Sequence, residues 1–187
     1  MSTGTTYTLG TSAPTGWSAQ QIIYYQLSCN MDGGFQFAFL EDSGIWDSGD
    51  IDTFIDDLLA NTLPELTPLG YTENPPNLRI TVPCYIVIEL DSSVNWRYQP
   101  AAPGIKLASN LSSKYFGLIQ VDNNGNETTG QAPASDKTSR ILYFGVANAA
   151  DDGSLDPYNL YVEFDMGFGD TVPMTIDPDI KNDGTPP

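Results

Sequence analysis

The sequence predicts an all-β protein: a single-domain antiparallel β-sandwich of the jelly-roll kind, with one short amphipathic helix. The first observation behind this is that short runs rich in β-branched and aromatic residues recur along the chain. The second is that Pro, Gly, Asn and Asp, the residues that favour turns, separate these runs. The third is length: 187 residues with no long linker are about one domain. We therefore expect residues 1–187 to form one domain, with a polar tail rich in Pro and Asp over residues 177–187.

The strand predictions rest on alternation between apolar and polar positions. The candidate strands are residues 22–27, 35–40, 79–91, 115–121, 140–147, 160–164 and 172–176, with residues 7–9 as a weaker one. In the longest candidate, alternate residues are apolar and share one face, namely Val82, Cys84, Ile86, Ile88 and Leu90. Pro83 lacks a backbone donor, so the start of this strand is expected to be an edge, a bulge or a bend.

One helix is predicted around residues 50–60. Its apolar residues recur at helical spacing, at Ile51, Phe54, Ile55, Leu58 and Leu59. Ser48 or Asp47 is the expected N-cap, and Asp50 and Asp52 suit the positive end of the helix dipole. Asn61 and Pro64 are expected to end it.

The charge and the missing histidine exclude several functions. The chain has 24 acidic and 7 basic residues, no His and a formal net charge of −17, and its first basic residue is Arg79. Without a basic stripe, binding to nucleic acid or to an anionic membrane is rejected. Without His there is no catalytic triad and no Cys–His nucleophile, and only Cys29 and Cys84 remain as zinc ligands. Carboxylate chemistry stays open.

The compartment and the cysteines are less constrained. The chain shows neither a basic region followed by an apolar run, as in a signal peptide, nor a membrane span. We expect the cytoplasm or an assembly such as a virion, or the extracellular space if a leader has been removed. Cys29 and Cys84 could form one disulfide, but two buried thiols are the favoured interpretation.

An oxygen-rich loop is the candidate metal site. Asp122, Asn124, Asn126 and Glu127 surround Gly125, and calcium prefers such oxygen ligands. However, Asn-Gly is also a strong signal for a β-hairpin turn, and the flanking residues resemble strands. A plain turn is therefore favoured, with calcium as the candidate cofactor if the loop binds an ion.

The candidate ligand site is Asn95-Trp96-Arg97-Tyr98. An aromatic ring, an amide and a guanidinium stand side by side there, in a segment expected to be a loop. Such groups suit a carbohydrate, which stacks on aromatic faces and forms hydrogen bonds with polar side chains. The alternative, which we favour, is that Trp96 fills one end of the core.

No catalytic constellation emerges, so the favoured function is a non-enzymatic structural or self-assembling protein, such as a virion, filament or inclusion component. Self-association is the expected partnership. The alternative is a carbohydrate-binding, lectin-like module that uses calcium. A carboxylate-based glycoside hydrolase is a distant third, because a Glu within a strand, such as Glu89 or Glu163, normally faces water. The specific ligand, the oligomeric state and the strand topology stay open.

Overall fold

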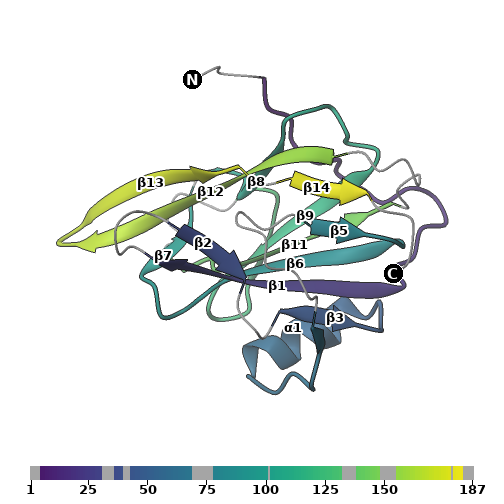
Figure 1. Cartoon of the computed structure of the whole chain (residues 1–187), viewed down its shortest axis with the longest axis horizontal. Coiled ribbons are helices and arrows are strands. Elements are labelled where there is room, and N and C mark those ends of the chain that lie inside the picture. Colours follow the sequence, from purple (N-terminus) through teal and green to yellow (C-terminus); the bar gives the residue numbers. More distant parts are fainter. Residues whose placement is uncertain are drawn as a thin grey trace.

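The computed structural model describes residues 5–30, 36–39, 43–68, 78–100, 102–131, 138–147, 155–177 and 179–182. Across these residues the predicted all-β architecture with one short helix is confirmed, and the strands form two sheets (Figure 1). The strands of the larger sheet are β1 (Gln21–Asn30), β2 (Gln36–Phe39), β3 (Gly44–Trp46), β4 (Thr67–Pro68), β6 (Cys84–Leu90), β9 (Tyr115–Val121), β10 (Glu127–Thr129) and β11 (Ile141–Val146). Those of the smaller sheet are β5 (Leu78–Ile80), β7 (Trp96–Tyr98), β8 (Ile105–Leu107), β12 (Leu155–Gly167), β13 (Asp170–Ile176) and β14 (Asp179–Asn182).

The centre of the larger sheet is a parallel pair. Its order is β10-β9-β11-β6-β1-β3-β4, with β2 also paired to β1, and β1 runs parallel to β6. In the smaller sheet β5 runs parallel to β14, and the other strand pairs are antiparallel. A parallel pair needs a crossover connection. The helix lies on the connection between β1 and β6, which explains why this pair departs from the predicted antiparallel pattern.

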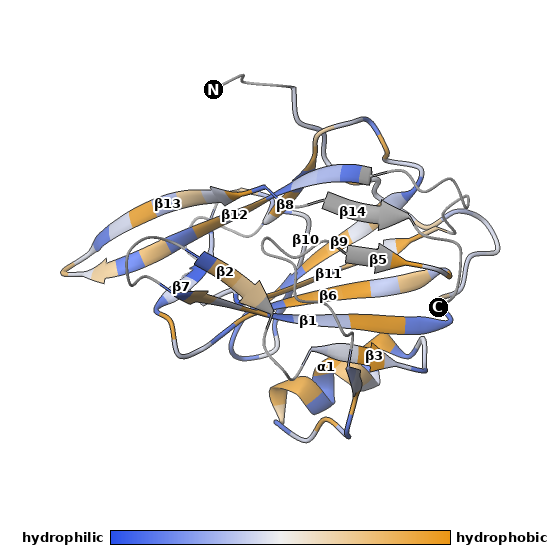
Figure 2. Cartoon of the chain, viewed as in Figure 1, coloured by the Kyte–Doolittle hydropathy of each residue, from blue (hydrophilic) through white to orange (hydrophobic). Residues whose placement is uncertain are grey.

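The inner face of the larger sheet packs on the smaller sheet. Side chains alternate along β1 and β6, so that Ile23, Tyr25, Ile86 and Ile88 enter one buried cluster with Phe164 and other residues of the smaller sheet. Figure 2 shows that β6 is hydrophobic along much of its length. Cys29 and Cys84 both lie in this cluster as free thiols, as favoured from the sequence, because they are on neighbouring strands but toward opposite ends.

The outer face of the larger sheet is covered by helix α1 (Ile51–Leu59), which lies on the side away from β12 and β13 (Figure 1). Phe54 and Ile55 pack there on Ile22, Val87 and their neighbours. Trp46 meets the ring of Phe54 edge-on, with centroids 5.0 Å apart, and so ties the helix to the sheet.

The ends of α1 correct one prediction. The N-cap is Asp50, whose carboxylate accepts a hydrogen bond from the Thr53 amide at 3.2 Å. Ser48 instead accepts from the Asp50 amide. At the other end Asn61 adopts a left-handed conformation, and the Thr62 amide donates to the Asp57 carbonyl at 2.9 Å. These bonds satisfy carbonyls that the helix leaves unpaired.

Two strand predictions and the prediction of a polar tail also differ from the structure. The candidate strand 79–91 is divided at residues 81–83 into β5 and β6, which belong to different sheets, since Pro83 cannot donate within a ladder. Within residues 7–9 only Tyr7 forms a bridge, to Leu107, and Gly10 just beyond them forms a second isolated bridge, to Phe116. Within the polar segment 177–187, residues 179–182 form β14 against β12, and 183–187 lie outside the described residues.

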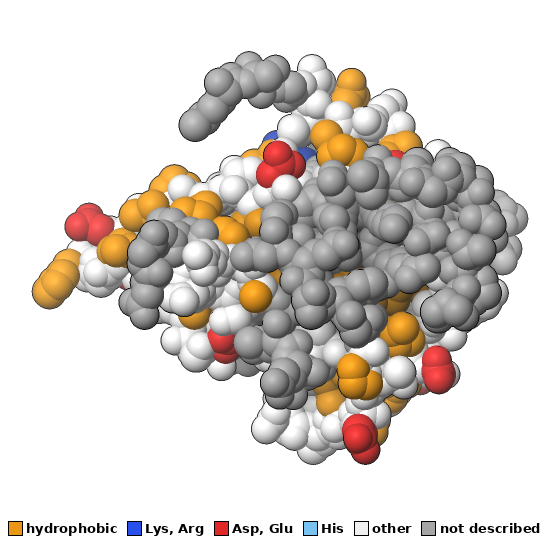
Figure 3. Space-filling view, in the orientation of Figure 1, with side chains coloured by type: hydrophobic (Ala, Val, Ile, Leu, Met, Phe, Trp, Pro, Cys, Tyr) orange, Lys and Arg blue, Asp and Glu red, His pale blue; other side chains and the backbone are white. Residues whose placement is uncertain are grey.

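A hairpin made by β12 and β13 extends from the body of the molecule (Figure 1). Its tip is a turn at Phe168 and Gly169, both with positive φ. Met166, Phe168 and Val172 are exposed there, and Figure 3 shows hydrophobic side chains at this end of the molecule. No helix in the described part of the chain has the length and apolar character needed to cross a membrane.

Candidate active site between α1 and the larger sheet

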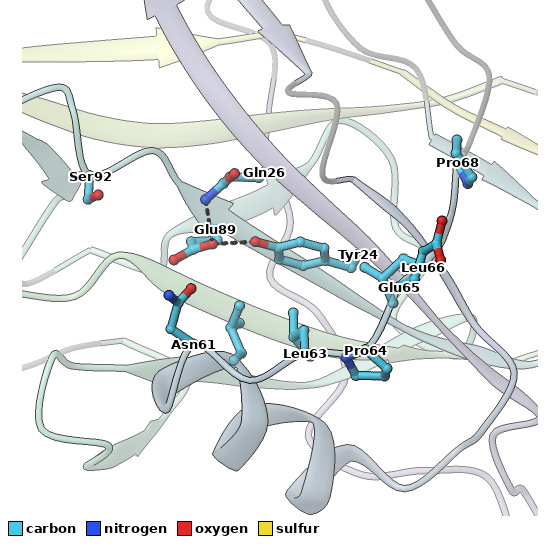
Figure 4. A pocket seen from close by; sticks show the side chains of 11 residues that line it. Tyr24, Gln26, Asn61, Leu63, Pro64, Glu65, Leu66, Pro68, Glu89 and Ser92 are labelled. Atoms are coloured by element: carbon cyan, nitrogen blue, oxygen red, sulfur yellow. Dashed lines mark hydrogen bonds between the residues drawn. The ribbon is translucent and has the colours of Figure 1, made fainter.

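A cavity of about 750 Å³ lies between the outer face of the larger sheet and the segment that follows α1. This volume is within the range of small-molecule sites. Its polar lining residues are Tyr24, Gln26, Asn61, Glu65, Glu89 and Ser92. Figure 4 shows Tyr24 and Gln26 pointing toward Glu89, with Asn61 on the helix side.

Strand alternation and the parallel register bring the central groups together. Tyr24 and Gln26 are two residues apart on β1, so both side chains face outward. The register places Gln26 beside Glu89 on β6. Asn61 and Glu65 come from the chain that leaves the helix, which turns back over this face because Asn61 takes a left-handed backbone conformation.

Glu89 is the central group of this site. Its Oε2 accepts hydrogen bonds from the Tyr24 hydroxyl and from the Gln26 amide, the latter at 3.0 Å. Among the described residues no group donates to the other oxygen, Oε1, and no Lys or Arg forms an ion pair with this carboxylate. Oε1 is therefore the atom available to a bound molecule.

Burial raises the pKa of Glu89, and the negative charge of Asp91 adds to this effect. The hydrogen bonds from Tyr24 and Gln26 and the positive charge of Arg140 oppose it without cancelling it. A carboxyl group whose pKa moves toward neutrality exchanges its proton more effectively as a general acid or base. The site therefore combines a cavity of substrate size with a group able to hold or release a proton.

A sequence model of a family described as "predicted novel nucleotide synthetase" matches residues 65–185. The chain belongs to this family. No curated protein and no solved structure matches the chain.

Membership in a nucleotide synthetase family corrects the functions expected from the sequence. The prediction of a non-enzymatic structural or self-assembling protein was wrong, as were the alternatives of a lectin-like module and a glycoside hydrolase. The physical reason is that Glu89 was expected to face water. Its strand position instead places it under the segment that follows α1, where burial and neutral hydrogen-bond partners change its chemistry.

The part of the chain that matches the nucleotide synthetase family supplies Glu65, Glu89 and Ser92 to the cavity, whereas Tyr24, Gln26 and Asn61 precede it. The same stretch contains all 7 Lys and Arg residues of the protein. The basic residues that a phosphate-bearing molecule could meet are therefore confined to this stretch.

Three of the four residues of the candidate ligand site 95–98, Trp96 to Tyr98, form strand β7 rather than a loop. Trp96 and Tyr98 alternate into the core, each 1% exposed, and donate hydrogen bonds to the carbonyls of Asp91 and Ile88. Arg97 points to the other face and pairs with Glu163, while the amide of Asn95 is exposed. The four side chains do not share one surface, and the favoured core role of Trp96 is confirmed.

The candidate calcium loop forms the turn between β9 and β10. Asp122 accepts hydrogen bonds from the backbone amides of Asn124 and Asn126, at 2.8 and 2.9 Å, and from the Asn126 side chain. The Asn126 side chain, followed by these amides, lowers the pKa of Asp122. Glu127 accepts from the Tyr143 hydroxyl at 2.7 Å. No group of three or more His, Cys, Asp or Glu side chains that could hold a metal ion occurs among the described residues, and calcium binding stays a prediction.

Sequence reasoning missed Tyr24 and Gln26 entirely and assigned Glu89 the wrong environment. One signal was present: Glu89 is the single charged residue within the run from Cys84 to Leu90. A carboxylate inside an apolar run marks either a water-facing position or a buried functional group. The choice between them depends on what covers the outer face, which the strand sequence alone does not specify.

Proposed function

We propose that this protein is an enzyme that forms a nucleotide, that its substrate binds in the cavity between α1 and the larger sheet, and that Glu89 exchanges a proton with it. One observation carries the proposal: a partly buried carboxylate with a raised pKa and one open oxygen lines a cavity of substrate size. The family to which the chain belongs supports the reaction class.

The chemistry of nucleotide formation requires a group of this kind. A nitrogen or oxygen nucleophile attacks a sugar carbon or a phosphorus atom, and the bond from that atom to its leaving group (phosphate, pyrophosphate or a nucleoside diphosphate) breaks. The nucleophile loses its proton as the new bond forms. Glu89 Oε1 is the acceptor for that proton, and Tyr24 and Gln26 hold the carboxylate in place through Oε2. A group with a raised pKa can also return a proton to a leaving group.

The charge around the cavity suggests how a substrate would lie. The residues that line it include Glu65 and Glu89 but no Lys or Arg. Its amide and hydroxyl groups, from Asn61, Gln26 and Ser92, suit the hydrogen-bonding edges of a base or a ribose. The positive charge of Arg140 acts on both Glu89 and Asp91. We therefore propose that a phosphate group is directed toward Arg140.

The test is product formation from a mixture of bases, nucleosides and nucleoside triphosphates with Mg²⁺, followed by mass spectrometry. The wild-type protein should produce a new nucleotide, and the Glu89→Gln variant should lose at least about 100-fold of the rate, the scale of a general acid–base contribution. Nucleoside or nucleotide binding, measured by calorimetry, should be detectable with both proteins.

The matched control is Asp170→Asn, which also removes one negative charge but lies at the start of β13, in the projecting hairpin. This variant should retain the wild-type rate. A protein that binds no member of the substrate mixture, or a Glu89→Gln variant as active as Asp170→Asn, would overturn the proposal.

A further inference from the structure

A second cavity lies on the same outer face, beside the first residues of α1. It has a volume of about 270 Å³, and four aromatic side chains line it together with one carboxylate: Trp17, Tyr85, Phe116, Tyr143 and Asp52. It shares no lining residue with the cavity around Glu89. We propose that this aromatic cavity binds a compact organic cation, such as a quaternary or alkylated ammonium group.

The angles between the rings favour a compact ligand over a flat one. The Trp17 ring is nearly perpendicular to Tyr85, at 86° with centroids 5.2 Å apart, and to Phe116, at 89° and 4.9 Å. Tyr85 and Tyr143 are also nearly perpendicular, at 85° and 6.0 Å. At these distances the rings contact one another edge to face, so together they form a continuous aromatic lining that presents both faces and edges. Such a lining suits a rounded cation better than a planar heterocycle, which stacks best between parallel rings.

The rings are held in place by contacts outside the cavity. The Trp17 indole donates a hydrogen bond to the Val146 carbonyl at 2.9 Å, and the Tyr143 hydroxyl donates to Glu127. Gly145 provides the space for Phe116, because a Cβ atom at that position would lie 2.4 Å from its ring. A preformed cavity loses little conformational entropy when it binds a ligand.

The charge of the cavity has the sign that a cation requires. Among the described residues that line the cavity, Asp52 is the only charged one. Burial, followed by the charge of Asp52, raises the pKa of Tyr85. Burial and the neighbouring Glu127 raise the pKa of Tyr143. Both phenols therefore stay neutral with electron-rich rings, and the net charge of −17 adds a general attraction for cations.

The experiment is calorimetric titration of the full chain with choline and, separately, with 3,3-dimethyl-1-butanol, which has the same shape without the charge. Choline should bind, and the neutral molecule should bind at least about tenfold more weakly, since a desolvated cation–π contact provides roughly this discrimination. Equal affinity would mean that the cavity is merely apolar, and no choline binding at millimolar concentration would mean that there is no site. Either result overturns the proposal.

Variants separate the cavity from general attraction. Tyr85→Leu should weaken choline binding by about tenfold. Asp52→Asn should weaken it by roughly threefold, because the carboxylate is exposed and screened by salt. Asp56→Asn, on the same helix but outside the cavity, removes the same charge and should have no effect. Equal weakening by the two Asp variants would also overturn the proposal.

The inference does not depend on the nucleotide chemistry proposed above. Glu89→Gln should leave choline affinity unchanged, since Glu89 does not line the aromatic cavity. Loss of choline binding in Tyr85→Leu with an unaltered melting temperature would show that the ring itself, and not the fold, is responsible.

Discussion

Two glutamates in the middle of strands show how different surroundings give one residue type two roles. Glu163 on β12 is directly opposite Arg97 on β7, and the guanidinium lies 2.6 Å from its Oε1. Glu89 on β6 is beside Gln26 and bonds only to the neutral donors of Gln26 and Tyr24. The first carboxylate is compensated by a full positive charge, and the second is not.

This difference in hydrogen-bond and ion-pair partners indicates which carboxylate can exchange a proton. The ion pair of Glu163 with Arg97 ties two strands together, so Glu163 acts in the fold. Neutral partners orient Glu89 without fixing its charge, and burial makes the protonated form more accessible. The predictions below test this contrast, beginning with the largest expected effect.

Glu89→Gln should remove the proton exchange that distinguishes Glu89 from Glu163. The amide keeps the size and can still accept a hydrogen bond from Tyr24, but it cannot exchange a proton. We expect at least about a 100-fold loss in the rate of nucleotide formation with little change in stability. Product formation and thermal unfolding of the same sample measure the two quantities, and a large loss of stability would show that Glu89 acts mainly in the fold.

Whereas Glu89→Gln should lower the catalytic rate, Arg97→Met should lower the stability of the protein. It leaves Glu163 without its cation at a site where both side chains are only 12% exposed, and we expect a loss of about 1–3 kcal/mol in the free energy of unfolding. Denaturant unfolding measures it. The double variant Arg97→Met with Glu163→Leu should recover most of the loss, and a double variant as unstable as the single one would contradict this account of the pair.

Tyr24→Phe should have an intermediate effect on the rate. The ring stays in place, but Oε2 of Glu89 loses one donor, so its carboxylate form is less well oriented and less stabilised. We expect the rate to fall by about tenfold, the lower end of the value of one hydrogen bond to a charged group. The pH–rate profile should also move to higher pH, and a lower rate with an unmoved profile would argue against a role through Glu89.

The smallest expected effect is on the pH dependence of stability. Because the pKa of Glu89 is raised on folding, its contribution to stability is full below the ordinary carboxyl pKa and is lost as pH rises through the folded-state pKa. The difference in unfolding free energy between wild type and Glu89→Gln should therefore fall over that window and then become constant. Denaturant titrations from pH 4 to pH 8 measure it.

Asp91, the first residue after β6, should show the opposite pH dependence of stability. Burial alone would raise its pKa, but hydrogen bonds from Ser93 and Ser28 outweigh it and the pKa is lowered. Its contribution to stability is therefore present above the ordinary carboxyl pKa and is lost as pH falls through the folded-state pKa. The same titration of Asp91→Asn should show this reversed dependence, and matching slopes for the two variants would contradict the assignment.

Local patterns predicted the elements that depend on neighbours in the chain. Alternation predicted residues 115–121, which are β9, and helical spacing predicted residues 50–60, which contain α1. The Asn-Gly signal predicted the turn between β9 and β10. In each case the residues that determine the structure are close together in sequence.

The predictions that failed concern features that depend on contacts between residues far apart in the sequence. The parallel pairing of β1 and β6 joins segments more than fifty residues apart, and no local pattern distinguishes it from antiparallel pairing. The short strand at residues 96–98 forms because β12 lies beside it. Glu89 was misassigned for the same reason: its burial depends on the segment that returns over the sheet after α1.

The decisive property of the proposed enzyme is that Glu89 has a raised pKa and contacts the substrate in the cavity beneath α1. The most direct measurement is a carbon NMR titration of the Glu side-chain carboxyl groups, with Glu89 assigned by its absence in Glu89→Gln. Glu89 should titrate above the ordinary value of about 4.3 for Glu, and its signal should shift when a substrate nucleoside or nucleotide is added. Titration at the ordinary value, with no response to any of these molecules, would contradict it.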